Sequence, residues 1–314
     1  MKYFFRLDGS NFDLSFYELK ALLDIYDINH RVLKKDEEYR IVIADCEASE
    51  KEIKRLCVRS TLIKFSGKLI GKIHGLELED FEDVNWGFVE IPFAVRVEDF
   101  GKIYDKQIEG RVASVIWWDL EERGRIPRVN LDMPKTLVYF FVTSPNDVYV
   151  VDYIWRPAKG RFKEREPHKR PGFHPASLKP KFARLLINLS RGDIDKKLLD
   201  CFCGVGGVLI ESSLLGCKTY GLDMDAKMIA MSKKNLKHYN AAGEVKQGDA
   251  RAIEKSFKGK FDCIAIDPPY GRSSSLGKIA MNDLYDSFLT SCWKVLKKGS
   301  YLAMIYPHYG FMRN

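Results

Sequence analysis

The stretch that decides the fold is LLDCFCGVGG, residues 198–207, which runs into the largely apolar segment 208–215. Two leucines lead to an aspartate, and glycines follow at positions 204, 206 and 207. This pattern is typical of a buried strand, a glycine-rich turn and a helix. Glycines let the backbone approach a ligand closely, and the N–H groups that open the helix favour a negatively charged group. The stretch therefore predicts a nucleotide-type ligand in an α/β fold.

The glycine-rich turn differs from the dinucleotide fingerprint. It reads G-x-G-G after Asp200 and lacks the third, helix-packing glycine of G-x-G-x-x-G. Cys201 and Cys203 are two residues apart on the predicted strand and share a face, which favours packing over a metal site because no second ligand pair is present. We therefore expect an organic ligand and no metal.

Three further aspartates close predicted strands: Asp223, Asp249 and Asp267. The intervening helices are predicted over residues 208–215, 226–239 and 251–257. Asp223 is placed to accept hydrogen bonds from two ribose hydroxyls, and Asp249 from an adenine amino group. One or two of these acids could be ordinary helix N-caps. Together with Asp200 they indicate a site at one edge of a parallel sheet.

The fourth predicted strand, residues 261–266, ends in Asp267-Pro268-Pro269-Tyr270-Gly271. Prolines lack an N–H and have a fixed φ, so the carbonyl groups of Asp267 and Pro268 are expected to point outward as unpaired acceptors. Acceptors that hold the hydrogens of a planar exocyclic amine draw its lone pair toward an electrophile. Tyr270 is predicted to stack on the ring that carries the amine. The alternative is a proline-rich turn with an exposed aspartate.

From about His174 onward the chain resembles the class I S-adenosylmethionine-dependent methyltransferases that methylate amino groups. The resemblance implies that the 200–206 loop faces the methionine end of the cofactor, that an acid holds the ribose, and that another faces adenine. The same turn occurs in enzymes that methylate adenine N6, cytosine N4, guanine N2 and glutamine amides. The residues that the resemblance assigns are Asp200, Cys203, Gly204, Gly206, Asp223, Met224, Asp249 and Ala250 for the cofactor, and Asp267, Pro268 and Tyr270 for catalysis.

Composition limits the class of protein. The 314 residues suffice for two or three domains, and 46% apolar content supports substantial cores. The sequence shows neither a run of eighteen apolar residues nor a signal peptide, so we expect a cytoplasmic protein without a membrane partner. Seven cysteines without paired spacing fit reduced thiols in that compartment. The oligomeric state is open, with a monomer expected.

The net charge of +8 is concentrated in one segment. Residues 156–184 carry ten Lys or Arg against two Glu, and they are rich in Pro and Gly, which predicts an extended connection between domains. Such a segment could simply be a solvated linker. Next to a base-methylating site, it also fits contact with a phosphate backbone. The predicted contacts are Arg161, Lys163, Lys169 and Arg170.

The first half of the chain has an α+β pattern without a glycine loop. Strands are predicted at 2–7, 39–44, 93–97, 136–142 and 147–154, and helices at 15–26, 47–58 and 108–120, with Ser15 and Glu18 as a capping box. This arrangement resembles a THUMP domain with its preceding ferredoxin-like segment, an RNA-binding module of tRNA-modifying enzymes. The expected domains are residues 1–75 (ferredoxin-like), 76–155 (THUMP-like), 156–175 (basic linker) and 176–314 (Rossmann-like methyltransferase).

With the sequence Phe173-His174-Pro175-Ala176-Ser177 before the catalytic domain, the whole chain resembles the archaeal tRNA (guanine-10-N2) methyltransferase family. The resemblance implies methylation of guanosine N2 in tRNA, once or twice, with S-adenosylmethionine as donor, and it places Ser177 at the methionine end. One departure is visible: after the fifth predicted strand, residues 301–307, only seven residues remain, where class I methyltransferases add a final strand pair.

Three alternatives stay open on the residues alone. A DNA adenine-N6 methyltransferase shares the catalytic turn but more often carries a target-recognition region. A glutamine-amide methyltransferase has little use for the basic segment. A non-catalytic RNA-binding protein with a methyltransferase fold is the third, although four intact acidic strand ends argue against lost activity.

Overall fold

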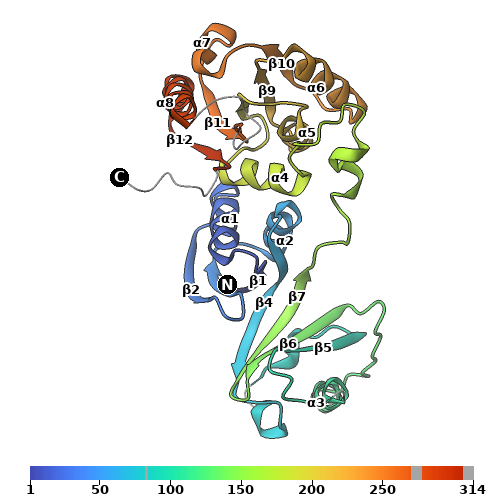
Figure 1. The fold of residues 1–314 in the computed structure, drawn as a ribbon. Helices are drawn as coiled ribbons and strands as arrows, with labels where there is room; N and C mark the ends of the chain where they lie inside the picture. The colour runs from blue at the N-terminus through green and yellow to red at the C-terminus, as the bar shows by residue number, and fades with distance from the viewer. Residues whose placement is uncertain (82–83, 106, 270–277, 307–314) are drawn as a thin grey trace. The chain divides into compact units, whose positions relative to one another are not determined.

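The computed structural model describes residues 1–314 except 82–83, 106, 270–277 and 307–314, and without the side chains of 278–282 (Figure 1). The chain forms two compact units. The first comprises Met1–Phe16 and Ile28–Pro157, and the second comprises Tyr17–Asp27 and Ala158–Asn314. Within the described part, no helix is long and apolar enough to cross a bilayer.

The first unit is built on a seven-stranded sheet with the order β2-β3-β1-β4-β7-β6-β5. Neighbouring strands are antiparallel except β5 and β6, which are parallel. Helices and 3₁₀ turns accompany the sheet; of α1, only residues Phe12–Phe16 belong to this unit. The bounds are β1 (Lys2–Leu7), β2 (His30–Asp36), β3 (Ile41–Cys46), β4 (Ile63–Ile73), β5 (Phe93–Asp99), β6 (Thr136–Ser144), β7 (Asp147–Trp155), α1 (Phe12–Ile25), α2 (Glu50–Arg59), α3 (Ile108–Glu122), η1 (Leu78–Phe81) and η2 (Trp86–Phe88).

Strand β6 is apolar along most of its length because both of its faces are buried. Phe140 belongs to the cluster that α3 covers through Val112 and Ile116. Its neighbour Phe141 points to the opposite face, where its ring stacks on Phe4 with centroids 4.5 Å apart. Successive side chains of a strand alternate between faces, so two adjacent phenylalanines fill two separate cores.

Two predictions for the first unit differ from the structure. Helix α1 begins at Phe12, and Ser15 lies inside it, where its hydroxyl donates to the carbonyl of Asn11 at 2.9 Å. The cap is Asn11, whose side chain accepts from the N–H of Leu14 at 2.9 Å. The capping box occurs instead at α2, between Ser49 and Glu52. Strands β2 and β4 were not predicted, since charged residues on both faces of β2 and two glycines in β4 hide the strand pattern.

The second unit contains a five-stranded parallel sheet with the order β10-β9-β8-β11-β12. The chain order reverses between β8 and β11, and the crevice beyond the carboxyl ends of strands at such a switch point is where α/β sheets bind ligands. The bounds are β8 (Lys197–Asp200), β9 (Lys218–Asp223), β10 (Glu244–Gln247), β11 (Phe261–Ile266), β12 (Leu296–Met304), α4 (Pro180–Leu189), α5 (Gly207–Leu214), α6 (Ala226–His238), α7 (Ile253–Ser256), α8 (Lys278–Val295), η3 (Lys163–Arg165), η4 (Pro167–Lys169) and η5 (Ala250–Ala252).

Helices cover both faces of this sheet, as alternate residues of the central strands show. Leu198 packs in the cluster that includes Ala183 of α4 and Val208 of α5. Leu199 packs on the opposite face with Phe288 of α8. The expectation of a Rossmann-like α/β domain is therefore confirmed.

The second unit is discontinuous in sequence, because residues Tyr17–Asp27 belong to it. Within this unit the amide nitrogen of Asn188, on α4, donates to the carboxylate of Glu18 at 2.7 Å, and both side chains are fully buried.

Strand β12 lies at one edge of the sheet and starts five residues before the strand predicted at 301–307. Gly299 lies inside it with φ +79°, an irregularity that hides the start of the strand in the sequence. In the part of the chain that the structure describes, β12 is the last strand; the prediction about a missing strand pair concerns residues 307–314, which lie outside the described residues.

Candidate active site

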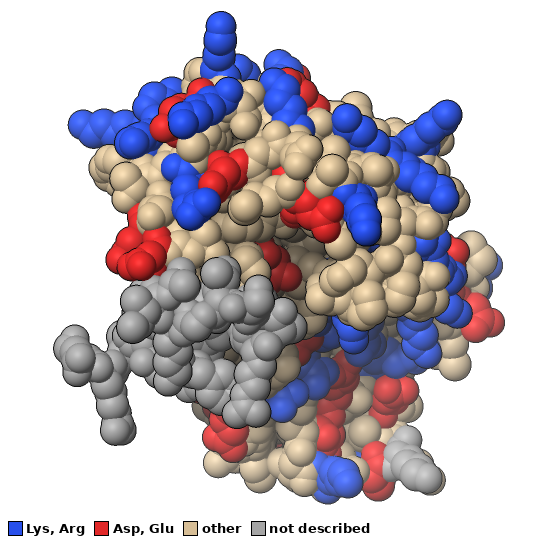
Figure 2. Space-filling model, turned by 45° about the horizontal axis from the view of Figure 1, so that its top comes forward, with Lys and Arg blue, Asp and Glu red and all other residues tan. Residues whose placement is uncertain are grey.

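Four aspartates lie at or just beyond the carboxyl edge of the parallel sheet. Asp200 and Asp223 are the last residues of β8 and β9, and Asp267 directly follows β11. Asp249 comes two residues after the end of β10. In parallel strands these ends meet at one edge. In the space-filling view, Asp and Glu side chains lie in and around a hollow, with Lys and Arg side chains projecting around it (Figure 2).

Asp200 is the most deeply buried of the four acids, with 2% of its surface exposed. Its carboxylate accepts a hydrogen bond from the N–H of Phe202 at 3.0 Å. Burial raises the pKa of Asp200 well above its usual value, and the negative charges of Asp267 and Asp223 raise it further. Asp267 and Asp223 therefore lie close enough to disfavour a negative charge on Asp200, so the site favours a positively charged ligand group.

The glycine-rich turn leaves space on one side and packs tightly on the other. Gly204 and Gly206 have φ values of +48° and +86°, which non-glycine residues rarely adopt. A Cβ on Gly206 would lie 2.6 Å from Oγ of Ser232, whereas a Cβ on Gly204 would meet no described residue within 4 Å. Gly204 is therefore the position where a ligand could approach the backbone.

The Asp223 carboxylate supports the turn by accepting hydrogen bonds from backbone N–H groups. Its carboxylate accepts from the N–H of Gly204 at 2.8 Å and from the N–H of Asp225 at 2.9 Å. The next side chain, Met224, is 62% exposed. Cys203 has the opposite surroundings: its thiol is buried against the inner side of the turn, and burial raises its pKa. Asp223 and Met224 therefore border the open side of the turn, and Cys203 supports it from within.

Asp249 is engaged by its own neighbours. Its carboxylate accepts from the backbone N–H of Arg251 at 2.8 Å, which caps η5, and from the Arg251 guanidinium at 2.6 and 2.9 Å. The hydrogen bonds from Arg251 lower the pKa of Asp249. Ala250, which follows, is buried. Of the four acids, this one acts as a helix cap in the structure.

Asp267 has the opposite character. Its side chain is partly buried, and its Oδ1 atom has no hydrogen-bond partner among the described residues. Burial raises the pKa of Asp267 to about 6. The Pro269 carbonyl accepts from the hydroxyl of Tyr285 at 3.4 Å, which ties the turn to α8. Pro268 is buried, and Tyr270, the third predicted catalytic residue, lies outside the described residues.

Ser177 lies in a turn before α4, where its N–H bonds to the carbonyl of His174 at 3.0 Å. Its side chain is half-buried. The hydroxyl also donates to the carbonyl of His174, and Pro180 opens α4 three residues later. The contacts of Ser177 are thus local to its own turn.

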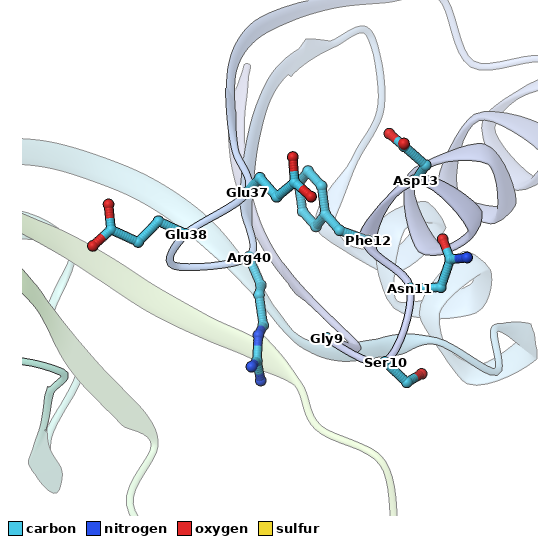
Figure 3. Close-up of a pocket in the computed structure, with 8 residues that line it drawn as sticks. All are labelled: Gly9, Ser10, Asn11, Phe12, Asp13, Glu37, Glu38 and Arg40. Carbon is cyan, nitrogen blue, oxygen red and sulfur yellow. The ribbon is translucent and has the colours of Figure 1, made fainter.

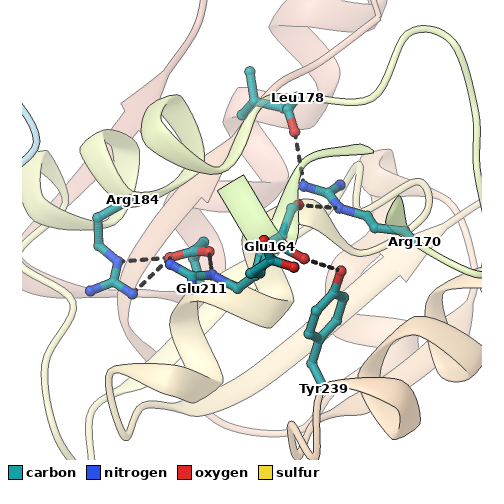
Figure 4. Close-up of polar contacts among 7 residues, drawn as sticks. Glu164, Arg170, Leu178, Arg184, Glu211 and Tyr239 are labelled. Carbon is teal, nitrogen blue, oxygen red and sulfur yellow. Dashed lines mark hydrogen bonds and ion pairs between the residues drawn. The ribbon is translucent and has the colours of Figure 1, made fainter. Parts of the chain in front are cut away.

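The basic segment is folded onto the second unit, in contrast to the predicted extended connection. Residues 163–169 form the 3₁₀ turns η3 and η4. Arg165 and Arg184 both bond to the carboxylate of Glu211, which is 1% exposed (Figure 4). Arginines that pair with a buried acid hold the segment against α5. The composition of the basic segment does not predict this pairing, although Glu211 is the single acid in an otherwise uncharged helix.

The four predicted phosphate contacts have different surroundings. Lys163 is exposed, and Lys169 pairs with Glu164 at 2.8 Å. Arg161 is half-buried, and its guanidinium lies over the ring of Phe162 at 4.7 Å. Arg170 is 4% exposed, so its guanidinium is not available to a phosphate in this structure.

Two hollows are found on the first unit. One, of about 420 Å³, is lined by Gly9, Ser10, Asn11, Phe12, Asp13, Glu37, Glu38 and Arg40 (Figure 3). The other, of about 330 Å³, is lined by Val129 and a face of α3 that includes Trp117 and Trp118. Neither contains a residue that the sequence singled out for chemistry. No group of His, Cys, Asp or Glu within the described ranges is arranged to hold a metal ion.

Comparison with known proteins yields a family model and several relatives that match most of this chain. Residues 167–314 match the family described as "RMKL-like, methyltransferase domain". A protein of Methanothermobacter thermautotrophicus is 32% identical over 297 residues, covering 93% of this chain and 84% of the relative. A protein of Pyrococcus abyssi is 33% identical over 305 residues, covering 92% and 84%. Both are named "tRNA (guanine(10)-N2)-dimethyltransferase".

Among solved structures, TrmN from Thermus thermophilus is similar over 97% of this chain and 88% of that chain, with a TM-score of 0.51 and 20% sequence identity. At that identity the likeness concerns the fold. It extends over both units and is not limited to the parallel sheet.

Proposed function

This chain belongs to the tRNA (guanine(10)-N2)-dimethyltransferase family and is a tRNA guanine-N2 methyltransferase; from that premise we propose that S-adenosylmethionine is the methyl donor and that Asp267 holds the amine. The observation that carries the proposal is the Oδ1 atom of Asp267, which is buried without a hydrogen-bond partner among the described residues. A buried acceptor without a partner is unfavourable unless a ligand supplies the donor. An exocyclic amine is such a donor.

The residues of the site fit the proposed donor. When bound, S-adenosylmethionine supplies an activated methyl group on a positively charged sulfonium. The carboxylates of Asp200 and Asp223 favour that positive charge, and the open side of Gly204 admits a ligand to the backbone. We propose that Asp223 and Met224 hold the ribose, that Ala250 and Asp249 border the adenine, and that Ser177 and the Cys203–Gly206 turn border the methionine end.

Asp267 and Pro268 carry the chemistry in this proposal. The carboxylate of Asp267 and the carbonyl of Pro268 accept the two hydrogens of N2, which orients its lone pair toward the methyl group. Positive charge develops on the nitrogen during transfer and is stabilised by these acceptors. With a pKa raised to about 6, Asp267 is mostly ionised at neutral pH and can take up the released proton. For Tyr270 we propose, from the sequence, that it stacks on the base.

The target guanine must leave its stacked position to reach Asp267, which costs a few kcal/mol. We propose that phosphate contacts offset this through the exposed or partly exposed cations of the basic segment, Arg161, Lys163 and Lys169. The segment contacts α6, since the Tyr239 hydroxyl donates to the carbonyl of Glu164 at 3.0 Å. Helix α6 extends the same basic surface with Lys227, Lys233, Lys234 and Lys237, all exposed.

For the first unit we propose RNA binding as a THUMP-like module with its ferredoxin-like segment. Its described residues include no glycine loop with strand-end acids around it of the kind found at the parallel sheet, which favours a binding role. This proposal includes domain boundaries at residues 75, 155 and 175. The structure itself divides into two compact units.

The decisive experiment is incubation of the protein with unmodified tRNA and S-adenosylmethionine labelled in the methyl group, followed by nucleoside analysis. Label in N2-methylguanosine, and later in the dimethylated form, is expected. Duplex DNA serves as the control substrate. Label only in N6-methyladenosine would overturn the substrate, and absence of cofactor binding in calorimetry would favour a non-catalytic RNA-binding protein.

A further inference from the structure

Arg170 is a buried cation next to the glycine-rich turn of the second unit. Its side chain is 4% exposed, although it lies in the most basic segment of the chain. Lysines and arginines are rarely buried to this degree unless a partner compensates the charge. The burial of the Arg170 charge therefore calls for an explanation in its surroundings.

Three parts of the chain meet at the Arg170 guanidinium. Its Nε donates to the carbonyl of Arg165 at 3.0 Å, and its Nη2 donates to the carbonyl of Leu178 at 3.2 Å (Figure 4). Its Nη1 lies 3.0 Å from the position that a Cβ on Gly207 would occupy. Gly207 is the first residue of α5, so the guanidinium fills the space beside the first turn of that helix.

The charge of Arg170 is only partly compensated. Glu211, the buried acid nearby, bonds to Arg165 and Arg184. Nη1 of Arg170 is buried and has no hydrogen-bond partner within the described part of the chain. Taking a guanidinium out of water is strongly unfavourable when no carboxylate bonds to it. Retaining such a group points to a role other than stability.

The position of Arg170 suggests that role. Leu178 ends the turn that contains Ser177, and Gly207 follows the turn that contains Gly204 and Gly206. Both turns are proposed to border the methionine end of the cofactor. Arg170 bonds to one and packs against the other, so it sets their separation. Its positive charge also lies beside the opening N–H groups of α5, which already favour an anion.

We propose that Arg170 is a positioning residue for the amino-acid end of the cofactor: it holds the 174–178 turn against the first turn of α5 and favours the carboxylate of the ligand there. The inference rests on the proposed function. It deepens that function by separating the recognition of the amino-acid end from that of the nucleoside. It also gives Arg170 a role distinct from phosphate contact by Lys163 and Lys169.

The test uses two ligands that differ in the amino-acid end. S-adenosylhomocysteine has an amino group and a carboxylate, whereas 5′-methylthioadenosine lacks both. Their affinities are measured by calorimetry on the full chain, for wild type, Arg170→Met and Arg170→Lys. Lys169→Met is the matched control, because it removes a neighbouring cation whose partner is the exposed Glu164.

We expect Arg170→Met to weaken S-adenosylhomocysteine on the order of tenfold, the size of one lost charge-assisted contact, and to change 5′-methylthioadenosine by less than about twofold. Arg170→Lys keeps the charge but lacks the planar arrangement of N–H donors, so its loss of affinity should lie between those of wild type and Arg170→Met. KM for S-adenosylmethionine should rise more than kcat falls. Lys169→Met should leave both affinities unchanged.

Three outcomes would overturn the inference. They are unchanged affinity for both ligands, an equal loss for both, or a smaller salt dependence of tRNA binding in the Arg170 variants, which would indicate a phosphate contact. If Arg170→Met does not fold, Arg170→Lys and Gly207→Ala provide the test. A Cβ at position 207 would press on Nη1 of Arg170, so Gly207→Ala should weaken the binding of S-adenosylhomocysteine and leave that of 5′-methylthioadenosine unchanged. Wild type that binds neither ligand would instead refute the proposed function.

Discussion

Asp249 and Asp267 lie at the same edge of one parallel sheet, and each follows the end of a strand by no more than two residues. Their chemistry differs. Arg251 and a backbone N–H satisfy Asp249 and lower its pKa. Asp267 has an oxygen without a partner among the described residues, and burial raises its pKa to about 6. A strand-end acid thus becomes reactive when the surrounding chain leaves it unpaired, and it becomes structural when a neighbour pairs it.

The largest effect should come from replacing the unpaired acid. Asp267→Asn retains the shape but loses the charge and one acceptor, and removing a group that stabilises developing charge lowers turnover by about 10²–10³-fold or more. The measurement is transfer of labelled methyl to tRNA at saturating cofactor. Asp249→Asn, the matched change, should keep turnover within about tenfold. Comparable losses in both variants would remove the distinction between the two acids.

A second effect concerns pH. Because Asp267 must be ionised to accept the amine hydrogens, kcat/KM should rise about tenfold per pH unit up to about 6 and then level off. The pKa of Asp249 is lowered, so that acid stays ionised over the same range. Asp249→Asn should therefore keep the inflection near pH 6. A flat profile between pH 5 and 7 would contradict the assignment to Asp267.

Stability should change in opposite directions. The raised pKa of Asp267 means that ionisation destabilises the folded state as pH rises from the unfolded value of about 4 to about 6, so Asp267→Asn should stabilise the protein at pH 7 by about 1–3 kcal/mol. The lowered pKa of Asp249 contributes stability above its unfolded value that is lost in acid, so Asp249→Asn should destabilise slightly at pH 7. Thermal unfolding at pH 7 and pH 4 measures both. Shifts of the same sign at pH 7 would be unexpected.

The smallest effect is expected for Arg251→Ala. The pair with Asp249 is largely solvent-exposed, so its loss should lower the free energy of unfolding by less than about 1 kcal/mol. The backbone N–H of residue 251 still caps η5 through Asp249. Chemical denaturation with the wild type as reference measures the change. A much larger loss would show that the Arg251 side chain also organises the site.

The strand ends could be predicted because motif and hydrophobic pattern coincide there. The pairing of Asp249 was harder to foresee, since it depends on how Arg251 turns back two residues along the chain. Arg170 shows a different limit: a basic segment predicts charge but not which cations are buried. Its burial follows from contacts with Leu178 and Gly207, which are 8 residues and 37 residues away in sequence. The sequence did not predict strand β2 because charged residues lie on both of its faces.

The bond between Glu18 and Asn188 joins residues 170 positions apart within one compact unit. During synthesis, residues 17–27 leave the ribosome long before α4 exists. The bond from Asn188 to Glu18 can form only after α4 has been synthesised. Completion of the catalytic unit is thereby coupled to the start of the chain, and a fragment that begins at residue 158 would present the buried Asn188 amide to solvent. Most of α1, although synthesised first, thus belongs to the unit that is completed only when the last residues of the chain are made.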